Sequence, residues 1–207
     1  MSGLRERKKQ ATREALMSAA LRLTLERGLE NVRIEDISAE AGVSPRTFSN
    51  YFSSKYEVLA ARHTDRAAYQ VAALRARPAQ EPLWQAMTEA TVQAWERHTG
   101  PQPVAPGPER LAATRLLVDE PSLQAEALKL TFASQRELAV AVAERTGSDP
   151  DRDLYPHLVA VTVTAAVQAV VGHWLHADPP VPIVPLFRDA LRQLAAGLPA
   201  PSTPGDT

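Results

Sequence analysis

The chain has 207 residues, carries a formal net charge of −1 and contains no cysteine. A prior of about 100–200 residues per domain allows one large domain or a small domain fused to a larger one. The absence of cysteine excludes disulfides, thiolate metal sites and cysteine nucleophiles. The apolar run Leu158–Leu175 is interrupted by Gln168, Gly172 and His173, which favours a buried helix over a membrane span. The basic start lacks the apolar stretch of a signal peptide, so we expect a cytoplasmic protein.

The two parts of the chain differ in charge. Residues 1–66 hold 12 Lys and Arg against 9 Asp and Glu, whereas residues 67–207 hold 11 against 15. Most of the N-terminal surplus comes from five side chains, Arg5, Arg7, Lys8, Lys9 and Arg13. A basic end on an acidic chain indicates that this end meets a polyanion. A solvated, frayed terminus has the same composition and stays open as an alternative.

Helical periodicity dominates the chain, and strict apolar–polar alternation is nearly absent. In the N-terminal part of the chain, a first helix is expected to end at Gly28 and a short second helix at Gly42. A third helix is expected from Pro45 to about Tyr51. A fourth is expected to begin with a capping box at Ser54–Glu57 and to end before Pro78. Further helices are expected from Pro82, over Glu109–Asp119, from Pro121 and from Pro150, and a last helix carries Phe187, Leu191, Leu194 and Leu198 on one face.

The segment Ile34–Lys55 is typical of a helix-turn-helix. Gly42 permits the left-handed backbone that lets the second helix cross the first steeply. The second helix is capped by Ser44, and its exposed residues are of the types that reach base edges and phosphates: Ser44, Arg46, Thr47, Ser49 and Asn50. We expect Ile37, Ala41, Val43 and Phe48 to pack the two helices together. Any surface helical hairpin with a capped second helix remains an alternative.

The run from Gly28 to Leu59 resembles the DNA-binding domain of the tetracycline-repressor (TetR) family. The resemblance rests on Gly28, Asp36-Ile37, Ala41–Ser44, Tyr51-Phe52 and Ser54-Lys55. The rest of the chain resembles the family only in its helical layout. The resemblance implies an all-α fold: a helix-turn-helix domain of three helices at residues 1–55, a larger helical ligand-binding and dimerisation domain at residues 56–198, and a tail at residues 199–207 that we expect to be disordered.

The resemblance also assigns roles to individual residues. Arg46, Thr47 and Asn50 would face the major groove, and Tyr51 and Lys55 would hold flanking phosphates. Phe48 and Phe52 would be core. Where the family commonly has a capping Thr, this sequence has Arg33, so we expect the cap to be lost while the guanidinium still reaches a phosphate. The expected DNA-binding set is Arg33, Ser44, Arg46, Thr47, Ser49, Asn50, Tyr51 and Lys55.

A homodimer is expected because one recognition helix reads only a few base pairs, and a symmetric pair on a palindrome supplies specificity. The run Leu158–Leu175 is apolar on more sides than one helix face. The resemblance implies a four-helix bundle between subunits. The expected interface residues are Val163, Val167, Val170, Trp174, Phe187, Leu191 and Leu194.

Members of the family bind a small-molecule effector among helices four to eight, which releases the DNA. The expected pocket residues are Trp84, Met87, Trp95, Phe132, Arg136, His157 and Thr162, although each of them also suits an ordinary core. Arg136 and His157 are singled out because a polar group inside an apolar bundle needs a partner or a ligand. Arg136 is the natural partner of a carboxylate or phosphate. The segment RTFSNYF resembles the subset that includes the mycofactocin-cluster regulator, which implies an acyl-CoA or fatty-acid-like effector.

An enzyme is the competing class. His173 and His176 are spaced to approach one metal ion, but no HExxH, Walker, GxGxxG or GxSxG motif accompanies them. We therefore predict no catalytic residue, metal or cofactor. The predicted protein is a repressor that binds a palindromic operator in double-stranded DNA as a homodimer, is released by a small-molecule effector and does not enter a membrane. The alternatives are an architectural DNA-binding protein without a ligand and a helical metal-dependent enzyme.

Overall fold

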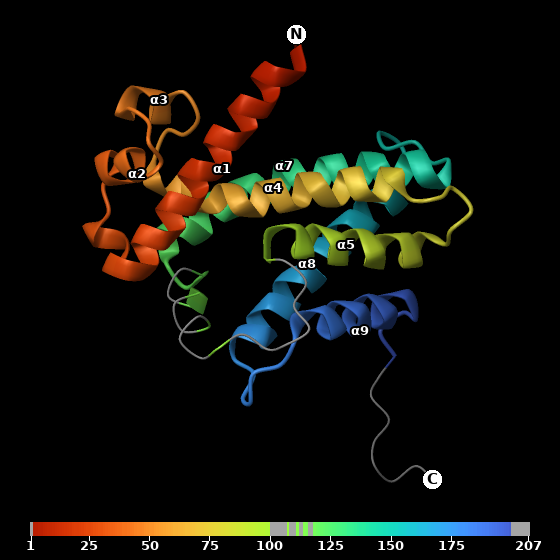
Figure 1. Ribbon diagram of the computed structural model, residues 1–207. Coiled ribbons are helices and arrows are strands. Elements are labelled where there is room, and N and C mark those ends of the chain that lie inside the picture. The colour runs from red at the N-terminus through yellow and green to blue at the C-terminus, as the bar shows by residue number, and fades with distance from the viewer. Residues whose placement is uncertain (1, 100–106, 108–110, 112–113, 116–117, 200–207) are drawn as a thin grey trace. The chain divides into compact units, whose positions relative to one another are not determined.

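The structure, a computed structural model, describes residues 2–99, 107, 111, 114–115 and 118–199. Its elements in chain order are α1 (Ser2–Arg27), the 3-10 helix η1 (Leu29–Asn31), α2 (Ile34–Glu40), α3 (Pro45–Ser49), α4 (Lys55–Ala76), α5 (Leu83–Thr99), α7 (Pro121–Thr146), α8 (Leu154–Leu175) and α9 (Ile183–Ala195) (Figure 1). The described residues contain no strand, and the predicted all-α fold is confirmed. The helix expected over Glu109–Asp119 and the expected tail fall mostly outside the described residues.

The chain divides into two compact units. The first contains Met1–Asp65 and Arg115–Leu130, and the second contains Arg66–Thr114 and Thr131–Thr207. Helix α4 contributes its first half to one unit and its second half to the other. The boundary that we predicted between residues 55 and 56 stays a prediction.

The first unit is built around one apolar cluster from α1, α2, α3 and the start of α4. Leu16, Ile37 and Phe48 are completely buried, and the rings of Phe48 and Phe52 lie 5.8 Å apart between centroids. Ala41 and Val43 pack against the same cluster. The core predicted for the two short helices is therefore confirmed, and it fixes α3 with its opposite face exposed.

Local backbone signals set the ends of the short helices as predicted. Gly28 and Gly42 have left-handed φ values of 79° and 68°, which L side chains rarely adopt. The hydroxyl of Ser44 accepts a hydrogen bond from the Thr47 backbone N–H at 3.1 Å, so Ser44 caps α3.

Two caps differ in detail from the sequence-based expectation. The Arg33 backbone N–H donates to the Asp36 carboxylate at 2.9 Å, so half of a capping box survives where we expected the cap to be lost. At the start of α4, the Ser54 hydroxyl accepts from the Glu57 N–H at 3.0 Å. The Glu57 carboxylate instead bonds the backbone N–H and hydroxyl of Ser53, one residue before the predicted partner, both at 2.6 Å.

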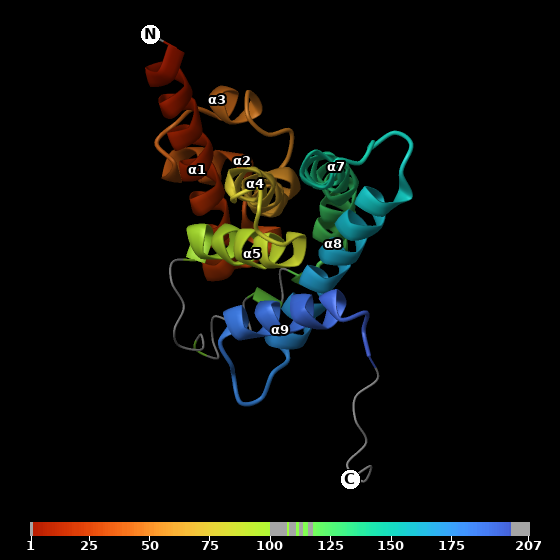
Figure 2. The same ribbon diagram turned by 90° about the vertical axis from the view of Figure 1, so that its right-hand side faces the viewer.

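The second unit contains two apolar clusters. One joins the second half of α4 to α5, α7, α8 and α9, with Met87, Val142 and Val163 completely buried. The other joins α5, α8 and α9, where Trp95 packs edge-on against Trp174 at 6.0 Å and against Phe187 at 5.1 Å between ring centroids. Figure 2 shows α8 and α9 packed together at one end of this unit.

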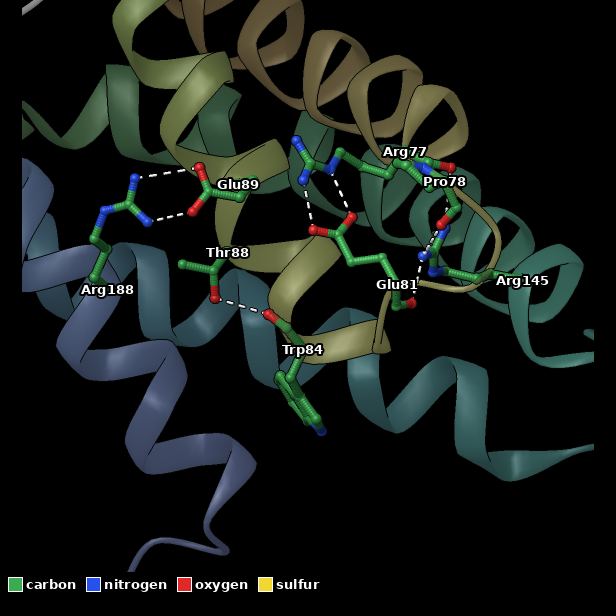
Figure 3. Close-up of polar contacts among 8 residues, drawn as sticks. All are labelled: Arg77, Pro78, Glu81, Trp84, Thr88, Glu89, Arg145 and Arg188. Carbon is green, nitrogen blue, oxygen red and sulfur yellow. Dashed lines mark hydrogen bonds and ion pairs between the residues drawn. The ribbon is translucent and has the colours of Figure 1, made fainter.

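Polar contacts tie the α4–α5 connection to α7 (Figure 3). The Arg145 guanidinium donates to the carbonyl oxygens of Pro78 and Glu81, both at 2.5 Å. The Glu81 carboxylate accepts two hydrogen bonds from Arg77, at 2.7 and 2.5 Å. A further ion pair joins Arg188 of α9 to Glu89 of α5. Charged groups thus fix the end of α4, the start of α5 and the end of α7, and the Arg188–Glu89 pair links α9 to α5 along their lengths.

The last helix ends earlier than expected, and the helix before it is long and apolar. Helix α9 stops at Ala195, and Gly197 and Leu198 both have positive φ values, so Leu198 is 62% exposed and does not continue the apolar face as we predicted. Helix α8 is long and apolar enough to cross a membrane by length and composition, a property that it shares with core helices of soluble proteins.

Candidate DNA-binding and effector sites

The exposed face of α3 carries the residues predicted to read bases. Arg46, Ser49 and Asn50 are exposed, and within the described residues the side chains of Arg46 and Asn50 make no hydrogen bond or ion pair. The Ser49 hydroxyl instead donates to the Pro45 carbonyl at 3.1 Å, and the hydroxyls of Ser44 and Thr47 lie 2.9 Å apart. The two side chains with multiple donors are therefore available to a ligand, while the hydroxyls are already engaged in shaping the helix.

The three residues predicted to hold phosphates have different surroundings. Arg33 is exposed, and Tyr51 is half-buried against the core of the first unit. The Lys55 ammonium donates to the carbonyl oxygens of Leu29 at 2.8 Å and Val32 at 3.2 Å. Sequence reasoning did not anticipate this link between α4 and the α1–α2 connection, because nothing in the local pattern pairs a lysine with carbonyls more than 20 residues earlier.

The seven predicted effector residues do not form one site. Met87 is buried in the cluster of α5 and α7 with Trp84 packed beside it, and Trp95 belongs to the other cluster. The Thr162 hydroxyl donates to the Leu158 carbonyl at 2.6 Å. These four side chains are occupied in the protomer itself.

The other three predicted effector residues come together in the α7–α8 pocket, an open pocket of about 570 Å³. It is lined by Phe132, Gln135, Arg136, Val140, Pro150, Asp151, His157, Ala160 and Val161. Phe132 is 66% exposed, and Arg136 and His157 are exposed rather than enclosed. Arg136 and His157 are therefore not the polar groups inside an apolar bundle that we expected, but both line the same pocket.

The chemistry of the α7–α8 pocket is amphipathic. Arg136 of α7 supplies a cation that holds no ion pair among the described residues, and Asp151, in the connection between α7 and α8, supplies an anion. One ring nitrogen of His157, Nε2, is 2.6 Å from the Pro150 carbonyl oxygen, which leaves Nδ1 as its second polar atom. Phe132, Val140 and Val161 supply apolar walls. Sequence reasoning missed Gln135 and Asp151, which lack any distinctive motif.

The residues predicted for the dimer interface lie inside the protomer. Five are buried, Val163, Val170, Trp174, Phe187 and Leu191, and Val167 and Leu194 pack against the same clusters. They hold α8 and α9 within one chain. The apolar surface that α8 leaves exposed is formed by other residues, Leu154, Tyr155, Leu158 and Val161, which are 48–69% exposed.

The histidine pair of the enzyme alternative is exposed at the end of α8. His176 has its Nδ1 2.8 Å from the Gly172 carbonyl oxygen. Among the described residues, no group of three or more His, Cys, Asp or Glu side chains is placed to hold a metal ion. The side chains of His63 and His98 lie outside the described residues.

A capped, exposed recognition helix on a helix-turn-helix core, followed by a larger helical unit, defines the class of bacterial DNA-binding transcriptional regulators. Residues 16–61 match the family described as bacterial regulatory proteins of the tetR family, and residues 81–199 match the MftR C-terminal domain. The chain belongs to the TetR family, whose members are generally not enzymes.

Individual relatives agree with this placement. The chain is 35% identical over 178 residues to the HTH-type transcriptional regulator TcmR of Streptomyces glaucescens, covering 85% of this chain and 79% of that protein. Among solved structures, the fatty acid degradation regulator FadR from Bacillus halodurans has a TM-score of 0.58 at 18% identity, covering 90% and 96% of the two chains. FadR from Thermus thermophilus in complex with lauroyl-CoA has a TM-score of 0.50 at 20% identity, covering 94% and 99%. These structural likenesses establish the fold.

Proposed function

We propose that this protein is a cytoplasmic repressor that binds a palindromic operator as a homodimer and is released by a small-molecule effector. Residues 1–55 would read the DNA, and residues 56–198 would dimerise and bind the effector. The observation that carries the proposal is the exposed pair of Arg46 on the capped helix α3 and Asn50 directly after it, in a chain of the TetR family. Arg pairs with guanine and Asn with adenine in the major groove.

The exposed apolar face of α8 supports the homodimer. Leu154 and Leu158 lie four residues apart, about one helical turn, and are 69% and 53% exposed. A contiguous apolar face of this kind is typical of an interface between protein chains. A second copy of α8 would cover it in an isologous contact, since the same face meets itself across a two-fold axis.

The α7–α8 pocket supports an amphipathic, anionic effector. The Arg136 guanidinium suits a carboxylate or phosphate, and Phe132, Val140 and Val161 suit an acyl chain. The match to the MftR C-terminal domain and the fold shared with a lauroyl-CoA-bound FadR are consistent with an acyl-CoA or a fatty acid. We assign Arg136 and Phe132 as contacts of this effector.

The test of DNA reading is a binding selection of the purified protein against random duplex DNA at near-physiological salt. Enrichment of a palindrome is the expected result, because two α3 helices related by two-fold symmetry read inverted half-sites. Binding that is salt-sensitive but enriches no sequence contradicts the proposal and favours an architectural role. An enriched site without two-fold symmetry contradicts the homodimeric part alone.

The effector is tested on the operator that the selection yields. Lauroyl-CoA, lauric acid and coenzyme A are each titrated against the protein–operator complex, and release is followed by fluorescence anisotropy. We expect release by an acyl compound and a clear loss of sensitivity in Arg136→Ala, with Arg152→Ala, an exposed arginine outside the pocket lining, as the matched control. Equal sensitivity of the two variants contradicts our assignment of the pocket.

A further inference from the structure

Helix α1 extends beyond the core of its own unit. Among the residues whose exposure is described, its first completely buried one is Leu16. One turn earlier the Arg13 guanidinium pairs with Asp65 at 2.9 Å and lies 4.9 Å from the Phe52 ring centroid. The helix axis from Arg13 back to Arg5 covers about 12 Å at 1.5 Å per residue. Residues 5 and 7–11, for which the exposure of the side chains is described, are all exposed.

The helix face that is apolar in the core becomes basic in this extension. Lys9 precedes Leu16 by seven residues and Arg5 precedes it by eleven, which are spacings of nearly two and three full turns. Arg5, Lys9 and Leu16 therefore lie on one face of α1. Arg7 lies on nearly the opposite side, because it is two residues from each of its basic neighbours.

The basic residues are placed against the local preferences of a helix. The first turn of α1 has no acidic residue, and cations near the start of a helix are disfavoured by the helix dipole. Arg5 and Lys9 are also four residues apart, so their like charges repel. Local conflicts of this kind mark functional positions when a ligand compensates for them. A polyanion compensates for both.

The extension lies at the same end of the first unit as the recognition helix. Both views show the N-terminal turns of α1 beside α3 (Figures 1 and 2). The helical turns that carry Arg5 and Lys9 therefore lie near α3 in the first unit. We propose that Arg5 and Lys9 bind phosphates of the DNA duplex flanking the bases that α3 reads, a contact that rests on the proposed function and adds sequence-independent affinity to it.

The test is the salt dependence of duplex binding, measured by fluorescence anisotropy for the operator and for an unrelated duplex. Each lost phosphate contact lowers the slope of log affinity against log salt by about 0.9. We expect Arg5→Ala and Lys9→Ala each to lower the slope by about one and to weaken both duplexes by the same factor. Arg7→Ala, which removes an equal charge from the opposite face, is the matched control and should leave the slope unchanged.

Thermal unfolding of the same variants distinguishes a structural role of Arg5 and Lys9 from a role in DNA binding. We expect Arg5→Ala and Lys9→Ala to keep or raise the unfolding temperature, since each removes a like-charge repulsion. A drop in unfolding temperature together with weaker binding contradicts the proposal. Arg5→Lys should restore the slope, because a phosphate contact requires the charge rather than the guanidinium shape.

These measurements distinguish failure of the phosphate contact from failure of the proposed repressor function. An unchanged slope in Arg5→Ala and Lys9→Ala, in a protein that still selects its palindrome, overturns the phosphate contact and leaves the proposed function intact. A slope that falls as much in Arg7→Ala also overturns it, since diffuse charge then accounts for the effect. If the slope falls as expected but the protein selects no sequence, the proposed repressor function is contradicted, while the proposal that Arg5 and Lys9 bind phosphates stands.

Discussion

The Lys55 ammonium at the start of α4 donates hydrogen bonds to the Leu29 carbonyl at 2.8 Å and to the Val32 carbonyl at 3.2 Å. An ammonium has three donors, so one remains for a phosphate. The side chain therefore connects the fourth helix to the backbone between α1 and α2 in the unit that contains the recognition helix. The three N–H donors of Lys55 therefore serve both this structural role and its predicted role in DNA binding.

Lys55→Ala is expected to lower the free energy of unfolding as well as DNA affinity. Hydrogen bonds to a charged group contribute about 1.5–3 kcal/mol. The variant removes the ammonium donor from both carbonyls, although the Leu29 carbonyl still accepts from the Val32 N–H at 3.3 Å. Urea unfolding followed by circular dichroism measures the loss, and Lys8→Ala, which removes an exposed lysine from α1, is the control. Equal stabilities of the two variants would show that the Lys55 contacts contribute nothing to the fold.

Arg46→Ala and Asn50→Ala are expected to relax sequence preference at separate positions of the operator half-site. Each bidentate contact to a base provides about 1–3 kcal/mol of discrimination. Affinities for the operator and for single-base variants of it measure the effect, with Arg152→Ala in the second unit as the control. A variant that loses affinity uniformly for all sequences would instead make that side chain a phosphate contact.

Gly42 is expected to tolerate Asn far better than Val. Its φ is 68°, and a Cβ built there meets no atom within 4 Å, so the cost of substitution lies in the backbone and not in a clash. The left-handed conformation costs an L residue about 1–2 kcal/mol, Asn tolerates it, and a β-branched residue is a marked outlier. Thermal unfolding of Gly42→Asn and Gly42→Val measures the difference, and equal losses would contradict this account.

The ion pair between Glu81 and Arg77 is expected to make the free energy of unfolding depend on pH. The two hydrogen bonds from Arg77 hold the pKa of the Glu81 carboxyl below its ordinary value of 4.5. The ion pair therefore stabilises the fold fully above the pKa of the unfolded chain, and this contribution disappears as the pH falls through the lower folded pKa.

The corresponding measurement compares the unfolding temperatures of the native protein and Glu81→Gln across acidic pH. We expect the variant to be less stable near about pH 7 and the difference to shrink towards zero below about pH 4. Glu137→Gln, a change at an exposed residue of α7, controls for the general effect of removing one charge. A difference in unfolding temperature that grows as the pH falls would contradict this prediction.

Leu158→Glu is expected to dissociate the proposed dimer without unfolding the protomer. Leu158 is 53% exposed in the protomer, so a carboxylate there is solvated until a second chain covers it, and burying it unpaired is costly. We expect the dimer dissociation constant to rise at least tenfold, which corresponds to about 1.4 kcal/mol. Analytical ultracentrifugation measures it.

The control for the dimer is Leu25→Glu, an equivalent change at a leucine of α1 that is 42% exposed. It should leave the dissociation constant unchanged. A dimer that survives Leu158→Glu would exclude the exposed face of α8 as the interface.

The N-terminal unit could be predicted from the sequence in considerable detail because its signals are local. A left-handed φ at Gly42, a hydroxyl cap at Ser44 and a proline at the first position of α3 each depend on residues within about four positions. The apolar spacing of Ile37 and Phe48 then defines which side of each short helix is buried. The exposed set on α3 follows by exclusion.

The second unit could be predicted only as a set of helices. Helix α8 is apolar on nearly every side, so periodicity does not distinguish the buried Val163 and Val170 from the exposed Leu158 and Val161. The face that packs inward depends on α5, α7 and α9, which come from distant parts of the sequence. For the same reason, the predicted interface residues lie inside the protomer.

The sequence by itself determined the helical class, the turn chemistry of the helix-turn-helix and the residues on its exposed helix, because each depends on near neighbours and on helical period. Only the tertiary structure decided that Phe132, Arg136 and His157 share one open pocket, that Met87 and Trp95 are core, and that Lys55 holds the carbonyls of Leu29 and Val32. These placements depend on which helices pack together, and the free energy that selects a packing is spread over many contacts between residues far apart in the chain.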